Sequence, residues 1–387
     1  MLTISREMLS DALPELSSSR IKSLSTYDLI CQTNLLVYPS AGVPVYTPFG
    51  QRVFDKMSQV IHSSAQRHGL SKLSLPVLQA AQLFERSGRY EDFGDGIYRT
   101  HNNSYILSPT SEEQIISFLS KRIRSYRSLP LHLYQIKPLF RNNQAHGVTR
   151  NKEFITFESY SFHINKENLI ADFKLYDDLF KSILDTFKID YFKHNKYEES
   201  HYIDYLFETE NGEYNVPKSK PQLDQQCDLN STVRASSICM GMIVKPSISE
   251  TFRLRVDTAH SGLQSLHVGT FGLGLLRAIT AIVEQKRDEY GLRLPPCLQP
   301  YAAVFIPESI KHAVHYNEFL SFALNRGDIV VDNRKCDRVY KIRYAFFIGV
   351  ERVIYITCSN GVLTYHVVYR SGESEEFSNL TSLNTAL

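Results

Sequence analysis

The stretch PTSEEQ (109–114) combines a hydroxyl and a carboxylate at a spacing that suits an ammonium ligand. Thr110 and Glu112 are two residues apart, so they lie on one face of an extended entry into a predicted helix. The same pattern is also typical of an ordinary helix start, in which Thr110 or Ser111 caps the helix and acidic residues occupy its first turn. Taken locally, both interpretations stay open.

The stretch FRNNQAHGVTRNKEF (140–154) places Arg141 and Arg150 on either side of a polar turn that contains Asn143. An arginine at the end of a buried strand needs a partner, and a phosphate matches its planar fork of donors. Phe154, at the exit of the turn, could stack on a nucleotide base. A hairpin with solvated charges and a core Phe accounts equally well for these residues when they are taken alone.

The stretch GTFGLG (269–274) precedes an apolar helix, as a dinucleotide-binding turn would. Its spacing is GxxGxG rather than GxGxxG, and no acidic residue follows where a ribose would need one, so we reject a Rossmann fold. Arg277 lies one turn into this apolar helix. Such an arginine must reach a partner or a cavity, and a bound phosphate would satisfy it.

The elements that must position these residues can be predicted from hydrophobic periodicity. Pro76, within the apolar run 72–78, marks a strand at an edge or an interface. Residues 190–238 are polar and irregular. The expected elements are a helix over 49–69, a strand over 72–78, a strand leading into a helix over 105–123, a hairpin of strands 131–140 and 154–164, a helix over 166–187, weak strands near 201–209 and 238–244, a strand near 252–257, and a glycine-rich turn and helix over 267–285.

The Pro-rich stretch LRLPPCLQP (292–300) marks a domain boundary. Beyond it, strands alternate with helices, which indicates a small α/β domain. We therefore predict an α+β chain in three parts: an N-terminal extension (1–26), an antiparallel body flanked by helices (27–291) and an α/β domain (299–387).

The composition is that of a globular protein, with 387 residues, 43% hydrophobic and 22% charged, and a net charge of +2. That charge is too small to indicate nucleic-acid binding by itself. The six cysteines form no CxxC pair and no cluster with zinc-ligand spacing, so we expect no metal held by the protein alone and a reducing compartment. No run of 18 apolar residues exists, so we expect no membrane span.

The first 26 residues are rich in Ser and carry both basic and acidic side chains. Arg6, Arg20 and Lys22 suit a mitochondrial targeting segment, whereas Glu7 and Glu15 are residues that such a segment avoids. We expect a location in the mitochondrial matrix, with the cytoplasm as the alternative.

Taken in order, these stretches resemble the motifs of class II aminoacyl-tRNA synthetases, and those of prolyl-tRNA synthetases in particular. The resemblance runs from about Tyr27 to the C-terminus. Residues 45–61 and 72–99 are similar to the first motif, with Pro76 at the dimer-forming proline. The other similar segments are LSPTSEE (107–113) for amino-acid binding, 134–163 for the second motif, 269–284 for the third motif and 299–370 for the anticodon-binding domain.

The resemblance implies an enzyme that uses ATP and Mg²⁺ to activate proline and then transfers it to tRNA(Pro), acting as a homodimer. Within the ATP site it gives Arg141 the α-phosphate, Phe154 the adenine ring and Arg277 the γ-phosphate, with Asn143 and Arg150 beside them. Arg141 and Arg277 would be the catalytic residues, because they stabilise charge during in-line attack on the α-phosphate.

The resemblance also implies an amino-acid site. Thr110 and Glu112 would hold the ring nitrogen of proline, with Arg141 and Thr270 lining the same pocket. No protein ligand for a metal is identified in either site.

Two departures from the family pattern leave alternatives open. The family has Arg-x-Glu where this chain has Asn143 as the third residue, and Met242 takes the place of a histidine beside the amino-acid pocket. The interval between the second and third motifs is too short for a large editing insertion. The alternatives to a compact prolyl-tRNA synthetase are a catalytically impaired paralogue that acts as an accessory or RNA-binding subunit, and an enzyme for a different amino acid.

Overall fold

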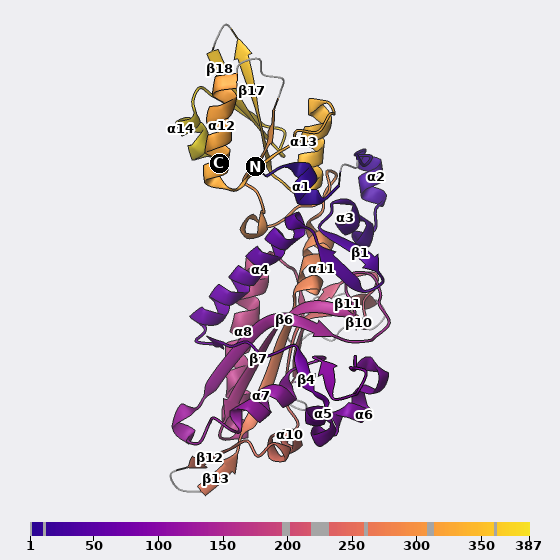
Figure 1. Cartoon of the computed structure of the whole chain (residues 1–387), viewed down its shortest axis with the longest axis vertical. Coiled ribbons are helices and arrows are strands. Elements are labelled where there is room, and N and C mark those ends of the chain that lie inside the picture. The colour runs from indigo at the N-terminus through magenta and orange to yellow at the C-terminus, as the bar shows by residue number, and fades with distance from the viewer. Residues whose placement is uncertain are drawn as a thin grey trace. The chain divides into compact units, whose positions relative to one another are not determined.

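The computed structural model describes residues 2–10, 13–195, 202–217, 232–258, 262–307, 313–359 and 362–387 (Figure 1). These residues form two compact units. Unit 1 comprises Met1–Pro39, Val45–Met57 and Ile282–Leu387, and unit 2 comprises Ser40–Pro44 and Ser58–Ala281. None of the helices in the described segments combines the length and the apolar character needed to cross a bilayer.

Unit 2 is built on an eight-stranded sheet in the described part of the chain. Its neighbouring strands are antiparallel except for the β3–β6 pair, and β10 pairs with β11 beside the main path. The predicted antiparallel body is therefore confirmed. In spatial order the strands are β3 (Ser71–Lys72), β6 (Leu131–Phe140), β7 (Glu153–His163), β14 (His267–Gly274), β11 (Thr232–Ile243), β9 (Tyr202–Glu208) and β8 (Phe192–Asn195), with β10 at Tyr214–Pro217.

The β6–β7 hairpin lies where the alternating apolar residues predicted it. Its register pairs Leu131 with Phe162 and Phe140 with Glu153, which leaves a long loop at the tip. Helix α8 (Lys166–Thr186) packs on the sheet, and the ring of Tyr176 stacks on that of Phe271 with centroids 3.5 Å apart. Buried aromatic packing of this kind makes the hairpin a rigid support for its loop.

The segment GTFGLG was expected to be a turn, and that expectation was wrong: it forms most of strand β14. Gly269 shows why glycine occurs in a strand here. A Cβ atom at this position would lie 2.8 Å from the Phe271 ring, from Leu169 and from the Ser161 hydroxyl. Glycine therefore makes room for packing on the sheet face, and the chain stays extended because its backbone pairs with β7 and β11.

The strand expected over 72–78 was also wrong. Pro76 lies between β3 and β4 in irregular chain, since it cannot donate a ladder hydrogen bond. The other elements of unit 2 are β4 (Leu78–Ala80), α5 (Ala81–Ser87), α6 (Arg89–Phe93), β5 (Tyr105–Leu107), α7 (Glu112–Leu119), α10 (Pro246–Thr251), β12 (Arg255–Thr258), β13 (Gly262–Ser265) and the 3-10 turns Gly94–Gly96 and Tyr126–Ser128.

Unit 1 contains a five-stranded sheet with the order β16-β15-β17-β18-β19 among the described residues. Strand β15 pairs in parallel with β16 and β17, as expected for an α/β arrangement, and β18 and β19 extend the sheet beyond β17 with antiparallel pairing. The elements are β15 (Ala303–Ile306), α12 (Ala313–Arg326), β16 (Ile329–Val331), α13 (Arg338–Phe347), β17 (Arg352–Ser359), β18 (Val362–Tyr369), β19 (Ser374–Phe377), α14 (Leu380–Ala386) and the 3-10 turn Pro296–Leu298.

The N-terminal segment is folded into unit 1. Thr3 forms a parallel bridge to Val331, and the buried carboxylate of Glu7 accepts hydrogen bonds from the Tyr301 hydroxyl and the Arg52 guanidinium. The remaining elements are α1 (Ile4–Met8), α2 (Ser18–Ser23), α3 (Thr26–Gln32), β1 (Leu36–Ser40) and β2 (Val43–Tyr46), and both units take residues from α4 (Pro48–Arg67) and α11 (Leu275–Lys286).

Candidate active site

A cavity of about 480 Å³ in unit 2 brings together almost all of the residues that the sequence singled out. Strands β7, β11 and β14 line it, together with the β6–β7 loop, the entry to α7 and the start of α11. The predicted site residues that line it are Thr110, Glu112, Arg141, Asn143, Arg150, Phe154, Thr270 and Arg277. Segments separated by more than 150 residues in the sequence thus meet in one cavity.

Glu112 organises one end of the cavity. Its carboxylate accepts a hydrogen bond from the Thr270 hydroxyl at 3.0 Å and a short one from the Thr110 hydroxyl. Ser111 occupies the N-cap position of α7, but neither it nor Thr110 caps the helix in the way the sequence also allowed. Instead, the Ser111 hydroxyl donates to Glu158, so the start of α7 carries its polar side chains into the site.

Arg89 is a site residue that the sequence interpretation missed. Its guanidinium lies 3.2 Å from Glu112 and 3.0 Å from Glu113. Burial alone would raise the pKa of Glu112, but Arg89 and the Thr110 hydroxyl outweigh it and hold that pKa below its usual range. Glu112 is therefore an ionised carboxylate that can accept hydrogen bonds from a ligand ammonium group.

Glu158 is a second missed residue. It is a buried carboxylate that accepts hydrogen bonds from Ser111 and Gln135, each at 2.9 Å. Burial and the nearby charge of Glu112 raise its pKa. One signal in the sequence could have revealed it, since it is the one acidic residue inside the apolar run FITFESYSF. Such a residue in a buried strand needs a specific partner.

Arg141 directly follows β6, and Phe154 lies at the start of β7, so both are at the tip of the hairpin. The Arg141 guanidinium donates to the carbonyl of Pro109 at 3.0 Å and lies over the Phe154 ring, 5.5 Å from its centroid. Burial lowers the pKa of Arg141, although arginine stays protonated in any case. The pair presents a cation and an aromatic face to the same cavity, as a nucleotide site requires.

Arg277 and Arg150 share a partner that the sequence did not suggest. The carboxylate of Glu213 lies 2.6 Å from Arg277 and 2.8 Å from Arg150. Arg277 also donates to the carbonyls of Ser237 and Thr149, so its orientation is fixed from three sides. Burial alone would raise the pKa of Glu213, but the two arginines lower it below its usual range.

The two departures from the family pattern also lie at this cavity. Asn143 is an exposed residue of the hairpin loop at the cavity's edge. Met242 pairs with Thr270 across β11 and β14, so its side chain is on the same face as the hydroxyl that contacts Glu112. Met242 therefore borders the Glu112 end of the cavity.

Pro76 is not part of the cavity. It is exposed, and its carbonyl accepts a hydrogen bond from Lys137 at 3.3 Å. Leu78 and Tyr105, on the paired strands β4 and β5, are also exposed, at 47% and 46%. This side of unit 2 thus presents apolar side chains to its surroundings.

The cavity has two chemically distinct ends. One end offers an ionised carboxylate with two hydroxyl groups, which suits an ammonium group. The other offers three arginines and an aromatic ring, which suit phosphates and a base. The cavity could therefore hold a ligand with an ammonium group at one end and phosphates at the other.

Comparison with known proteins agrees with this geometry. Residues 97–286 match the family described as the tRNA synthetase class II core domain (G, H, P, S and T). This segment contains every predicted site residue except Pro76.

Curated relatives extend the similarity over most of the chain. The chain is 26% identical to a proline–tRNA ligase of Agrobacterium fabrum over 422 aligned positions, which cover 94% of this chain and 95% of the relative. It is 24% identical to a proline–tRNA ligase of Sulfurimonas denitrificans, with 86% of this chain and 88% of the relative covered.

Solved structures share the fold. A prolyl-tRNA synthetase of Giardia lamblia in complex with prolyl-adenylate superposes with a TM-score of 0.70 at 17% identity, covering 94% of this chain and 75% of that one. A prolyl-tRNA synthetase of Cryptosporidium parvum complexed with L-proline and AMP gives a TM-score of 0.73 at 18% identity, covering 95% and 75%.

Proposed function

The chain belongs to the class II tRNA synthetases, and we propose that it activates proline with ATP and transfers the prolyl group to tRNA(Pro). One observation carries this proposal most directly. An ionised Glu112, supported by Thr110 and Thr270, shares a single cavity with Arg141 and Arg277. The curated relatives are proline–tRNA ligases, which supports proline as the amino acid.

In the first step, a carboxylate oxygen of proline forms a bond to the α-phosphorus of ATP, and pyrophosphate leaves with the electrons of the broken P–O bond. Glu112 and the Thr110 hydroxyl hold the ammonium group of proline, so that its carboxylate faces the phosphate. Arg141 stabilises the negative charge that develops on the α-phosphate oxygens. Phe154 orients the adenine ring, and catalysis comes mainly from this positioning.

In the second step, a hydroxyl of the terminal ribose of tRNA attacks the carbonyl of prolyl-adenylate, and AMP leaves. The mixed anhydride is already activated, so the chain's residues only have to hold the adenylate and admit the tRNA end.

Arg277 is bound to Glu213 in this structure. When ATP binds, its γ-phosphate would compete with that carboxylate for the guanidinium.

We propose Mg²⁺ as the metal cofactor, on the chemistry of the donors in the cavity. Magnesium prefers oxygen ligands and is commonly held by one or two carboxylates together with substrate phosphates. One oxygen of Glu213 takes both arginine contacts, and its carboxylate lines the cavity beside them, which fits such a site. When bound, Mg²⁺ would neutralise part of the phosphate charge. Loss of ATP-dependent activity on chelation, restored by added Mg²⁺, tests this.

The experiment that tests the function is proline-dependent exchange of pyrophosphate into ATP. We expect exchange with the wild-type chain, and a loss of at least about a hundredfold in Arg277→Ala, because an arginine that holds the γ-phosphate stabilises the charge of the leaving pyrophosphate and contributes several kcal/mol. Arg122→Ala, an exposed arginine of unit 2 outside the cavity, is the matched control and should retain activity.

The outcomes separate the alternatives. A folded chain that exchanges with none of the twenty amino acids would support the impaired paralogue and refute the enzyme. Exchange with another amino acid but not proline would support an enzyme of different specificity, for which Met242 and Thr270, paired across β11 and β14, are the first residues to exchange.

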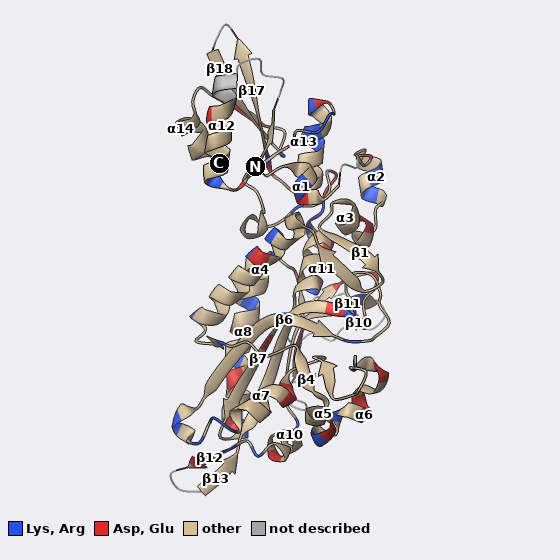
Figure 2. Ribbon diagram, in the orientation of Figure 1, with Lys and Arg blue, Asp and Glu red and all other residues tan. Residues whose placement is uncertain are grey.

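We propose that the chain binds tRNA(Pro) partly through unit 1. In Figure 2 the ribbon of α13 has blue segments, the colour of Lys and Arg, and the sequence supplies Arg338 and Arg343 there and Lys335 just before it. Arg334, which precedes α13, pairs with the buried Asp332 and is less available. Affinity for tRNA should fall as salt is raised, and binding that ignores salt would contradict the proposal.

We further propose a homodimer, formed through the exposed apolar side chains Pro76, Leu78 and Tyr105. Apolar residues left at a surface favour burial against a partner. Leu78→Asp should shift the mass measured by light scattering from that of a dimer to that of a monomer, and an unchanged mass would contradict this interface.

We also propose a location in the mitochondrial matrix, supported by the Ser-rich, Arg-containing N-terminal segment. Because residues 3–7 make contacts within unit 1, we expect these residues to remain in the chain after import. Imaging of a C-terminally tagged chain tests the location, with the cytoplasm as the contrary result, and mass spectrometry of the recovered protein tests whether the segment is retained.

A further inference from the structure

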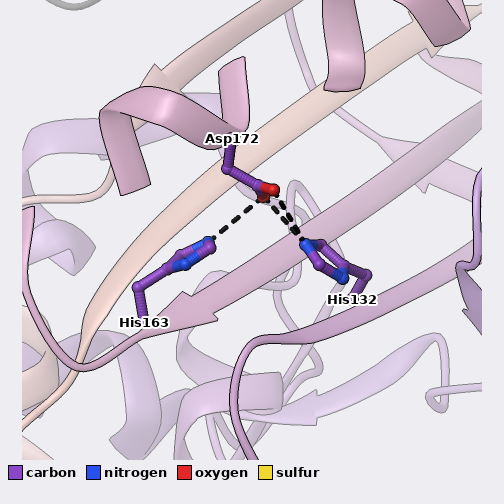
Figure 3. Close-up of side chains that lie close together, drawn as sticks. All are labelled: His132, His163 and Asp172. Atoms are coloured by element: carbon purple, nitrogen blue, oxygen red, sulfur yellow. Dashed lines mark hydrogen bonds and ion pairs between the residues drawn. The ribbon is translucent and has the colours of Figure 1, made fainter. Parts of the chain in front are cut away.

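Three side chains with metal-binding atoms converge on the face of the unit 2 sheet that α8 covers (Figure 3). His132 comes from β6, His163 from β7 and Asp172 from α8. The Asp172 carboxylate lies 2.9 Å from His132 Nε2 and 3.2 Å from His163 Nε2. Strand register explains the meeting of the two histidines, since His132 pairs with Ser161, two residues before His163 and therefore on the same face.

This cluster is separate from the candidate active site. None of its three residues lines that cavity. Phe154 and His163 stand near opposite ends of β7, nine residues apart, which corresponds to about 30 Å of extended strand. Adenylation and tRNA charging as proposed above leave the cluster without a role.

The cluster has the donor set and spacing of a transition-metal site. Two imidazoles and one carboxylate are common zinc ligands, and bonds of about 2.0–2.2 Å place the ligand atoms of a tetrahedral site roughly 3.3 Å apart. Here the three ligand atoms lie within 4.8 Å of one another, and the two Nε2–carboxylate distances are near the expected spacing. Only small movements would therefore admit an ion.

The surroundings also favour a cation. His163 is almost fully buried, with 2% of its side chain exposed, while His132 and Asp172 retain 13% and 11%. The Asp172 carboxylate lies within hydrogen-bond distance of Nε2 of both imidazoles, so all three ligand groups face one another. The remaining exposure at His132 and Asp172 gives water and ions a way in.

We propose that His132, His163 and Asp172 bind one divalent transition-metal ion, preferentially Zn²⁺, which clamps α8 to the β6–β7 hairpin. In the metal-free state, both Nε2–H groups donate to the carboxylate. On binding, each ring exchanges its Nε2 proton through water for a proton on Nδ1, so that the Nε2 lone pair faces the ion. Water completes the tetrahedral coordination.

The proposal is tested by titrating the chelator-treated full chain with Co²⁺, a spectroscopic substitute for Zn²⁺. We expect one equivalent to bind with the visible absorption of tetrahedral cobalt, without the near-ultraviolet band of a cobalt–thiolate bond, and Zn²⁺ to displace it. Zn²⁺ should also raise the melting temperature, because an ion that binds only the folded state stabilises it.

His132→Gln is the informative variant, since its amide can still reach Asp172 and preserve the fold. Its affinity for Co²⁺ should fall by at least about tenfold, and Zn²⁺ should no longer raise its melting temperature. His366→Gln is the matched control, because His366 also faces a carboxylate, Glu376 at 3.2 Å, but has no second histidine there.

Three results would overturn the proposal: no cobalt binding by the wild-type chain, equal affinity in His132→Gln, or a thiolate band that assigns the ion to cysteine. Because the wild-type titration alone can give the first or the third result, the test stands even if the variant fails to fold. The measurements are independent of catalytic activity and hence of the proposed function.

Discussion

At the scale of a single residue, the contacts of Glu112 fit the role in amino-acid binding that we propose for it. Its carboxylate accepts hydrogen bonds from the hydroxyl groups of Thr110 and Thr270 and forms an ion pair with Arg89. Because the carboxylate is buried, these contacts are stronger than they would be in water. Its partners fix the carboxylate before any ligand arrives. An ammonium group that binds there gains a charged acceptor already in position.

The substitution Glu112→Gln should raise the KM for proline by roughly 10- to 100-fold, the equivalent of about 1.5–3 kcal/mol for a hydrogen bond to a charged group. Pyrophosphate exchange at varied proline concentration measures this. Glu85→Gln, an exposed glutamate of α5 outside the cavity, is the control. An unchanged KM in Glu112→Gln would show that the amine binds elsewhere.

The neighbouring Glu113 should make stability depend on pH. Burial raises its pKa to about 6 against an ordinary 4.5, with Arg89 acting in the opposite direction and Glu112 in the same direction. The folded state holds the Glu113 proton more tightly than the unfolded state does. The contribution of this group to the free energy of unfolding is therefore complete below pH 4.5 and is lost as the pH rises through 6. The loss amounts to about 2 kcal/mol for a shift of this size.

Urea unfolding at several pH values tests this expectation. The free energy of unfolding of Glu113→Gln should fall less between pH 4.5 and 6.5 than that of the wild-type chain. Glu113→Gln keeps an acceptor for Arg89, so the two proteins differ mainly in the titrating group. Parallel curves for both proteins would contradict a raised pKa.

Most of the residues that line the candidate site could be predicted from the sequence because they break a local pattern. Arg277 is a cation in an apolar helix, and Arg141 ends an apolar strand. Glu213 could not be predicted, because it follows a polar stretch without periodicity and acquires its role only through contacts with distant arginines. The pairing of His132 with Asp172 could not be predicted for the same reason, since strand register and helix packing bring the two residues together.

The loop of the β6–β7 hairpin depends on a second element, the turn between β1 and β2. The carbonyl of Gly42 accepts hydrogen bonds from the backbone N–H groups of Lys152 and Glu153. Gly42 has a φ of 77°, and a Cβ atom there would lie 2.7 Å from the Cβ of Ala145. The turn therefore supports the loop that carries Arg141 and Arg150 to the cavity.

The substitution Gly42→Ala should displace this loop and raise the KM for ATP by about tenfold, since small misplacements of a positioned group cost at least that much. Gly69→Ala is a matched control: its φ is 78°, but a Cβ atom there meets nothing within 4 Å. Both variants should lose about 1 kcal/mol of stability from backbone strain. An equal KM for ATP in the two variants would rule out support of the loop by this turn.

At the level of elements, regular hydrophobic periodicity predicted helices and strands correctly, whereas the interpretation of proline and glycine positions gave two wrong elements. The hairpin strands and α8 lie where apolar residues repeat with the right period. The expected strand through Pro76 and the expected turn at 269–274 were both wrong. Glycine signals a turn only when the backbone needs it, and in β14 the requirement is space for the Phe271 ring.

At the scale of the whole molecule, the predicted α+β class with an antiparallel body and a parallel-containing C-terminal sheet is confirmed. The sequence did not indicate that unit 1 gathers residues from three segments of the chain. Local patterns report which element forms, whereas the pairing of Thr3 with Val331 depends on contacts across most of the sequence.

Glu7→Ala should therefore destabilise unit 1 by about 1–3 kcal/mol, because it leaves the buried Tyr301 hydroxyl without its acceptor. Glu15→Ala, at an exposed position of the same segment, should have little effect. In a Tyr301→Phe background the cost of Glu7→Ala should be smaller. Equal costs in both backgrounds, measured by urea unfolding, would show that the two side chains are not coupled.

The bridge between the N-terminal segment and β16 also sets an order of events during synthesis on the ribosome. The backbone N–H of Val331 donates to the carbonyl of Leu2, two groups that are 329 residues apart in the chain (331 − 2). At about 5–20 residues per second, roughly 15–65 s separate their translation. Throughout that interval Ile4 and Met8, buried in the finished protein, have no β16 to pack beside and are open to chaperones and proteases.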